Sequence, residues 1–195
     1  FGLLELESPD ATHSTCIGVR NSNDKKFAAG MVVGDRTTVC DNLVFSGEHK
    51  LARKHTNRIM AELPAMIDRF VQAVPVLVTD RSRELRQLKS RWITDGNAYK
   101  FILAMARMEV IARNKVVQVA DEWDLPGSTC DKVEEFEEFA RWGKSLYRLQ
   151  QAFTTVMTSQ REKANIFALP DKTIRLSREL AQLADTSRLS SSPLA

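Results

Sequence analysis

Short apolar runs separated by turn-forming residues occupy the first 47 positions. The segments 15–19 (TCIGV) and 27–33 (FAAGMVV) are rich in residues that favour strands. The segment between them, 21–26 (NSNDKK), is typical of a hairpin turn. We therefore predict about three or four antiparallel strands in region 1–47, and we expect helices to cover the sheet because so small a sheet is marginal alone.

The apolar spacing changes to a helical period after residue 47. Ser46 is a candidate N-cap for a helix over 48–63, and apolar positions continue beyond it on one helical face. Pro64 interrupts the pattern and either opens a second helix or kinks a long one, and Pro75 interrupts it again. Further helices are predicted at 82–92, 95–111, 132–159 and 170–184.

The clearest helical pattern lies in the segment 132–159. Its apolar residues alternate three and four positions apart: Phe139, Trp142, Leu146, Leu149, Phe153 and Val156. The pattern covers under three heptads, so a helix buried in a bundle explains it better than a coiled-coil dimer. The predicted fold class is therefore α+β, with a small N-terminal antiparallel sheet packed on a larger helical bundle.

Composition fits a single globular domain. Of 195 residues, 43% are hydrophobic and 27% are charged, which rules out a fibrous or wholly disordered chain. No stretch approaches the roughly 18 uninterrupted apolar residues of a membrane helix, so we expect no membrane contact. No Gly-rich linker divides the chain. We predict that the β region 1–47 shares one core with the helical region 48–185, followed by a flexible tail at 186–195.

The cysteines indicate a cytoplasmic protein. Cys16, Cys40 and Cys130 make an odd count without a CxxC motif, which is typical of reduced thiols. A Cys16–Cys40 bridge is the less favoured alternative. Because the chain begins at Phe1 rather than Met, we expect it to be part of a longer protein, and a targeting segment before it stays open.

Sequence motifs for metal or cofactor binding are lacking. There is no HExxH, no paired cysteine–histidine spacing, and no phosphate-binding glycine loop. The histidines are His13, His49 and His55. His49 and His55 would lie on different faces of the predicted helix. We therefore expect no metal and no cofactor.

Two residue sets could support catalysis, but each has a simpler structural explanation. Cys40, Asp41 and His55 could form a nucleophilic trio, although a half-buried strand cysteine explains Cys40 better. Asp35, Asp41 and Glu48 could hold Mg²⁺ in a metal-dependent nuclease, although turns and a helix N-terminus explain the same carboxylates. We expect a protein without catalytic residues and keep the nuclease as an alternative.

Basic residues are concentrated between positions 48 and 91. This segment has ten basic and five acidic residues, a net charge of +5 in a chain whose net charge is +3. On the predicted helix the candidate nucleic-acid-binding residues fall within about two to three turns, where they could follow a phosphate backbone. They are Lys50, Arg53, Lys54, His55 and Arg58. No run of aromatic residues suggests base stacking.

The segment 121–138 has the opposite charge, with eight acidic residues and Lys132 as its one basic residue. Both charged segments are also explained by solvated helix faces. We expect non-catalytic nucleic-acid binding, with single-stranded DNA as the preferred partner. The alternative is a protein-interaction module that acts on a host factor through the acidic segment 121–138.

Several strings resemble one protein family in order and spacing. They are 18–24 (GVRNSND), 39–48 (VCDNLVFSGE), 53–56 (RKHT), 142–154 (WGKSLYRLQQAFT) and 175–181 (RLSRELA). The family is the phage- and plasmid-associated domain of unknown function 932. The chain departs from it at Gln150-Gln151, where the family more often has an asparagine, and lacks the family's N-terminal part. The resemblance implies carriage on a phage or plasmid and a bacterial cytoplasmic location, but no particular activity.

Overall fold

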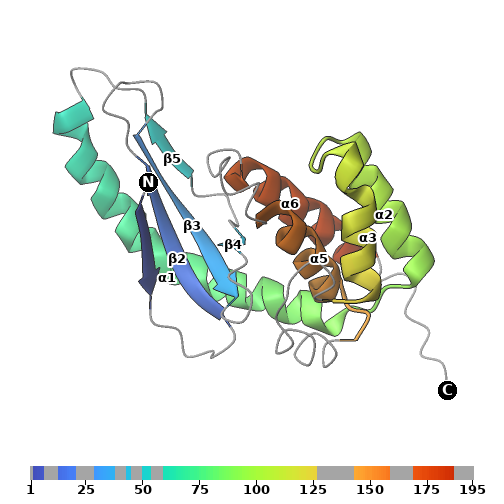
Figure 1. The fold of residues 1–195 in the computed structure, drawn as a ribbon. Helices are drawn as coiled ribbons and strands as arrows, with labels where there is room; N and C mark the ends of the chain where they lie inside the picture. The colour runs from blue at the N-terminus through green and yellow to red at the C-terminus, as the bar shows by residue number, and fades with distance from the viewer. Residues whose placement is uncertain are drawn as a thin grey trace. The chain divides into compact units, whose positions relative to one another are not determined.

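A computed structural model describes residues 2–6, 13–20, 29–37, 43–44, 50–53, 59–126, 143–158 and 169–186. Strands come first along the chain and helices follow (Figure 1), which confirms the predicted α+β class. The chain divides into two compact units, residues 1–82 and residues 83–195, and the division falls inside the longest helix. No helix in the described ranges has the length and apolar character needed to cross a membrane.

The first unit contains an antiparallel sheet. Its central strands β2 and β3 pair along their whole lengths, and β1 pairs with β2 on the other side. β4 and β5 both pair with β3, β5 near its start and β4 near its end. The bounds are β1 Gly2–Leu6, β2 His13–Arg20, β3 Ala29–Thr37, β4 Leu43–Val44 and β5 Lys50–Arg53.

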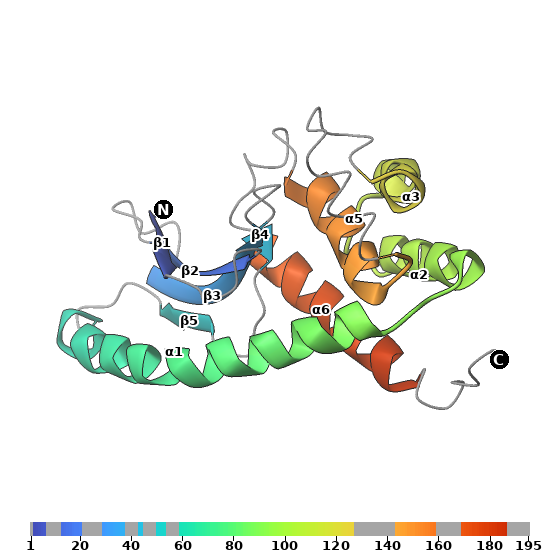
Figure 2. The ribbon, with the colours of Figure 1, turned by 90° about the horizontal axis from the view of Figure 1, so that it is seen from below.

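The sheet packs on the N-terminal part of helix α1, Ile59–Ser90 (Figure 2). Ile17 and Val33 lie opposite each other in the β2–β3 register and are buried together with Phe70 and Val74 of α1. Directly paired residues share a face of the sheet, so this face is the one that the helix covers. The expectation that a helix covers the sheet is confirmed within this unit.

Residues 50–53 form strand β5, so the helix predicted over 48–63 is wrong at these positions. Arg53 pairs with Ala29 and Lys50 pairs with Val32, which places the segment beside the start of β3. Pairing with an existing strand satisfies backbone groups on both strands. This gain outweighs the weak helix preference of the sequence KLAR, because intrinsic propensities differ by under about 1 kcal/mol per residue.

Helix α1 continues through both prolines. Pro64 and Pro75 lie inside one helix of 32 residues, so neither a new helix at Pro64 nor a separate helix over 82–92 is present. A proline inside a helix costs roughly 3 kcal/mol, because it removes a backbone donor. Burial of apolar side chains on both sides of Pro75 offsets this cost, with Phe70 before it and Leu88 after it.

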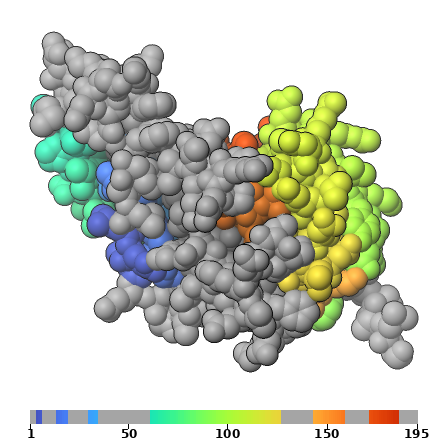
Figure 3. Space-filling view, in the orientation of Figure 1, coloured from blue at the N-terminus to red at the C-terminus, as the bar shows by residue number. Residues whose placement is uncertain are grey.

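The second unit is helical beyond the end of α1. Helix α5 is its central element: it contacts α3 and α6, and nearly all of its side chains are buried. The surfaces of α2 and α3 are visible in Figure 3. The bounds are α2 Asp95–Arg107, the 3₁₀ turn η1 Arg113–Lys115, α3 Val116–Asp124, α5 Leu146–Thr158 and α6 Leu169–Thr186.

Two predicted helices differ from those observed in this unit. Helix α2 ends at Arg107 rather than at residue 111, because Glu109 has a left-handed φ of 60° that turns the chain. The turn buries Val110 and Ile111 after the helix has ended. The predicted helix over 132–159 is wrong at 143–145, which are not helical, because Gly143 has a left-handed φ and Ser145 pairs with Trp92. It is present at Leu146–Thr158, where every apolar position of the predicted pattern is buried.

A truncation in α5 should destabilise the second unit strongly. Leu146 is 2% exposed, so Leu146→Ala should lower the free energy of unfolding by about 2–5 kcal/mol through lost burial and a new cavity. The matched control is Leu103→Ala on α2, where the leucine is 49% exposed and the loss should stay below about 1 kcal/mol. Urea denaturation followed by circular dichroism measures both, and equal losses would contradict the central position of α5.

Candidate functional site

The structure describes two of the five predicted nucleic-acid-binding residues, and neither lies on a helix. Lys50 and Arg53 lie in strand β5, while Lys54, His55 and Arg58 lie outside the described residues. In the described part of the sheet, β5 pairs with β3 alone.

The residues considered for catalysis are largely outside the described residues. Cys40, Asp41, Glu48 and His55 are among them, so neither the nucleophilic trio nor the Mg²⁺ set is tested. Cys16 is described and is fully buried in β2. Across the described ranges, no three metal-ligating side chains lie close enough together to hold a metal ion.

The acidic segment 121–138 is described only as far as residue 126. Asp121 is exposed, but Glu122 is buried, and the carboxylate of Asp124 accepts hydrogen bonds from Tyr99. Two of these three acidic side chains are therefore used inside the fold. The part of the segment that could contact a host protein lies at 127–138, beyond the described residues.

A different group of cations lies at the C-terminal end of α1. Residues 83–91 contain four basic residues and one acidic residue: Arg83, Arg86, Lys89, Arg91 and Glu84. Arg83 and Arg86 are exposed, while Lys89 and Arg91 are half-buried. The Lys89 ammonium lies 5.0 Å from the centre of the Tyr147 ring, a cation–π contact that holds this side chain against α5.

Trp92 directly follows these cations and is 71% exposed. The backbone on both sides of it is bonded to the start of α5. Leu146 N–H donates to the Arg91 carbonyl at 2.8 Å, and Ile93 N–H donates to the Lys144 carbonyl at 2.9 Å. Trp92 and Ser145 thus form an isolated antiparallel bridge. An exposed indole is thereby carried on a fixed segment of backbone.

Gly143 fits closely against the Trp92 indole. Its φ is 51°, a backbone conformation that residues other than glycine adopt only at an energetic cost. A Cβ at this position would lie 2.6 Å from Cζ3 of Trp92, well inside van der Waals contact. The backbone conformation therefore favours glycine, and a side chain at this position would also displace the exposed Trp92 ring from where it lies.

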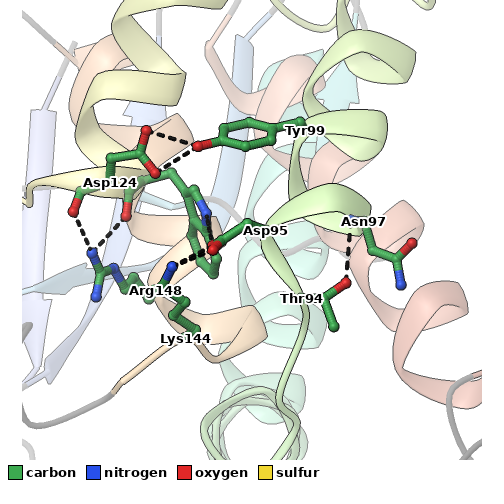
Figure 4. A network of polar contacts seen from close by, with 8 residues as sticks. Thr94, Asp95, Asn97, Tyr99, Asp124, Lys144 and Arg148 are labelled. Carbon is green, nitrogen blue, oxygen red and sulfur yellow. Dashed lines mark hydrogen bonds and ion pairs between the residues drawn. The ribbon is translucent and has the colours of Figure 1, made fainter.

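A network of polar contacts centred on Asp95, three residues after Trp92, joins nearby segments of the second unit (Figure 4). At its centre the Asp95 carboxylate accepts hydrogen bonds from Trp123 Nε1 at 3.1 Å and from Lys144 Nζ at 2.5 Å. The bond from Lys144 is the main reason why the pKa of Asp95 is lowered. The network ties the first residue of α2 to α3 and to the residues before α5.

Arg148 and Tyr99 extend the network on the α3 side. Arg148 lies over the Trp123 ring, 5.4 Å from its centre, and donates to the backbone carbonyls of Trp123 at 2.6 Å and Asp124 at 3.0 Å. Burial lowers the pKa of its guanidinium. Tyr99 donates to the Asp124 carboxylate at 2.7 Å, and this bond raises the pKa of the phenol. Most polar atoms of these groups are paired within the network, although the buried Nε of Arg148 has no hydrogen-bond partner. The network is suited to holding the helices together.

No protein-family model matches the chain, and neither a curated protein nor a solved structure shows significant similarity to it. The family resemblance described above stays a hypothesis. The function has to be inferred from the chain's own residues.

The requirement for glycine at position 143 can be tested against a second glycine. Gly143→Ala should lower the free energy of unfolding by about 1 kcal/mol or more, because it adds both backbone strain and overlap with Trp92. Gly96→Ala is the control: it lies in the first turn of α2 with no atom within 4 Å of an added Cβ. Alanine there should stabilise the helix by up to about 1 kcal/mol. Urea denaturation should give opposite signs for the two, and equal effects would contradict the close fit.

The Asp95–Lys144 ion pair should make the free energy of unfolding depend on pH. Because the pKa of Asp95 is lowered by folding, the pair stabilises the fold above the unfolded-state pKa, and this stabilisation is lost as the pH falls through the folded-state pKa. Asp95→Asn should therefore destabilise the protein at about pH 7, and the difference from wild type should shrink toward about pH 3. Lys144→Gln should show the same trend. Urea denaturation at both pH values measures it, and a difference that does not change with pH would exclude this role for the pair.

Proposed function

We propose that the protein binds nucleic acid through its phosphate backbone, without catalysis, by the cations at the C-terminal end of α1. The observation that carries the proposal is the concentration of Arg83, Arg86, Lys89 and Arg91 within nine positions of one chain segment. Their net contribution with Glu84 is +3, which equals the formal net charge of the whole chain. A local excess of this kind is the electrostatic footprint of a polyanion-binding surface.

The structural alternative accounts for part of this segment. Cations in the last turn of a helix interact favourably with its dipole, and this explains Lys89 at the end of α1. The effect falls off within one turn, so it does not explain Arg83 or Arg86, which are exposed farther back on the helix. Arg91 follows the helix end and directly precedes Trp92. These three arginines are the residues that the proposal needs.

The proposal also includes where the protein binds nucleic acid and which nucleic acid it prefers. The resemblance to the domain of unknown function 932 family supports carriage on a phage or plasmid, and the odd cysteine count supports the bacterial cytoplasm. Replication, recombination and transfer of such elements all expose single-stranded DNA. We therefore take single-stranded DNA as the preferred partner.

Binding should weaken steeply as salt rises. If about three phosphates of a single strand are neutralised, log K should fall against log salt with a slope near −2. The double variant Arg86→Ala/Arg91→Ala should bind more weakly, and its slope should be flatter by about 1.4, because two phosphate contacts are lost. Fluorescence polarisation with a labelled oligo-dT, between about 50 and 200 mM salt, measures affinity and slope together.

A matched variant separates a local site from general charge. Lys100→Ala/Arg107→Ala removes two exposed cations from α2 in the same unit and should leave the slope close to that of wild type. Equal weakening by both double variants would show that no site is localised at the end of α1. The absence of binding to single-stranded and duplex DNA at low salt would exclude the proposed function.

A further inference from the structure

Trp92 is the most exposed of the large hydrophobic side chains in the described ranges, at 71%. An indole left in water contributes little to folding, since its stabilising effect depends on the apolar area it buries. Yet the fold constrains this residue closely. The backbone bonds on both sides of it fix the main chain, and its ring lies against Gly143, which has a left-handed φ.

Basic residues lie close to Trp92 along the chain. Arg91 precedes it directly, and Arg86 lies one turn before the end of α1. Lys144 is adjacent to Gly143, although its ammonium is paired with Asp95. The charge complements a phosphate chain, and the ring offers a surface for a base. An aromatic plane beside cations is the combination that single-strand binding proteins use, because every base has a π-face.

We propose that Trp92 stacks on an unpaired base of a single-stranded nucleic acid whose phosphates are held by Arg86 and Arg91. This inference rests on the proposed function and adds to it the group that the protein recognises besides phosphate. Stacking requires a base that is free to leave its neighbours, which a duplex does not offer without unpairing. The indole therefore selects single strands over duplexes, while the arginines alone would bind both.

The fixed backbone at Trp92 increases the expected gain from stacking. A residue whose main chain is already held in place loses less conformational freedom when it binds. Because stacking involves no hydrogen bonds to base edges, it tolerates any sequence. The shared chemistry of unpaired bases is found in DNA and RNA alike, so both have to be tested.

The test uses the full chain with labelled oligo-dT, oligo-U and a DNA duplex of equal length. Trp92→Ala should weaken binding of the single strands by roughly 5- to 150-fold, the range that corresponds to the loss of one stacked base. Binding of the duplex should change by less than about twofold, because its bases are already stacked. The salt slope should stay at the wild-type value, since no phosphate contact is removed. Comparable effects with oligo-dT and oligo-U would place recognition in the base, while loss with oligo-dT alone would assign the site to DNA.

Two further variants change the ring or its position without deleting it. Trp92→Phe keeps an aromatic ring and should retain most of the affinity. Oligo-dT should quench the tryptophan fluorescence of wild type more than that of Trp92→Phe. Trp123 is fully buried, and Trp142→Phe is the control for the third tryptophan of the chain. Gly143→Ala displaces the ring without removing it, so it should weaken single-strand binding while duplex binding persists.

The outcomes distinguish this inference from the proposed function. If wild type binds with a salt slope that Arg86→Ala/Arg91→Ala flattens, but Trp92→Ala binds single strands like wild type, stacking is wrong and phosphate binding stands. Equal weakening toward single strands and duplex by Trp92→Ala would also overturn stacking. If wild type binds no nucleic acid, both proposals are wrong.

Discussion

The carboxylate of Asp95 joins three segments that are far apart in the sequence. It is the first residue of α2, and its two oxygens receive donors from Trp123 at the end of α3 and from Lys144 just before α5. The same Lys144 contributes the backbone carbonyl that receives Ile93 N–H. This carboxylate and the backbone bonds of Arg91 and Ile93 together join the residues that follow α1 to the start of α5. Both the exposed position of Trp92 and the place of Gly143 against it depend on that connection.

The fold class could be predicted from the sequence because two different periods of apolar residues are visible. The strand segment 15–19 and the apolar pattern of α5 are found where the periods place them. The sequence of segment 50–53 weakly favours a helix, so the strand there is not predicted from it. Its conformation is set by backbone pairing with residues 29–32 of β3, which are distant in sequence. The helix breaks expected at Pro64 and Pro75 are absent for a related reason. The cost of a proline is local, whereas the burial that offsets it comes from residues distant in sequence.

The candidate site was harder to predict than the fold. The excess of basic residues between 48 and 91 was visible, but its charge alone does not show which cations share a surface. The stripe expected at Lys50 and Arg53 depended on a helix that is absent there. A count of aromatic residues does not single out Trp92 as a candidate binding residue, because what distinguishes it is its exposure in the fold. The one local hint was the segment Arg91-Trp92, in which a large ring follows a basic helix.

The fit between Gly143 and Trp92 has a consequence for how sequences related to this one can diverge. Where the Trp92 ring lies now, it would overlap a Cβ at position 143, although the two positions are 51 residues apart. Substitution at either position changes which residues are acceptable at the other. A lineage that replaces the tryptophan with a small side chain frees position 143 to accept asparagine or alanine at only the cost of a positive φ. The two positions should therefore covary, and a glycine retained at 143 would mark the lineages that still carry the ring.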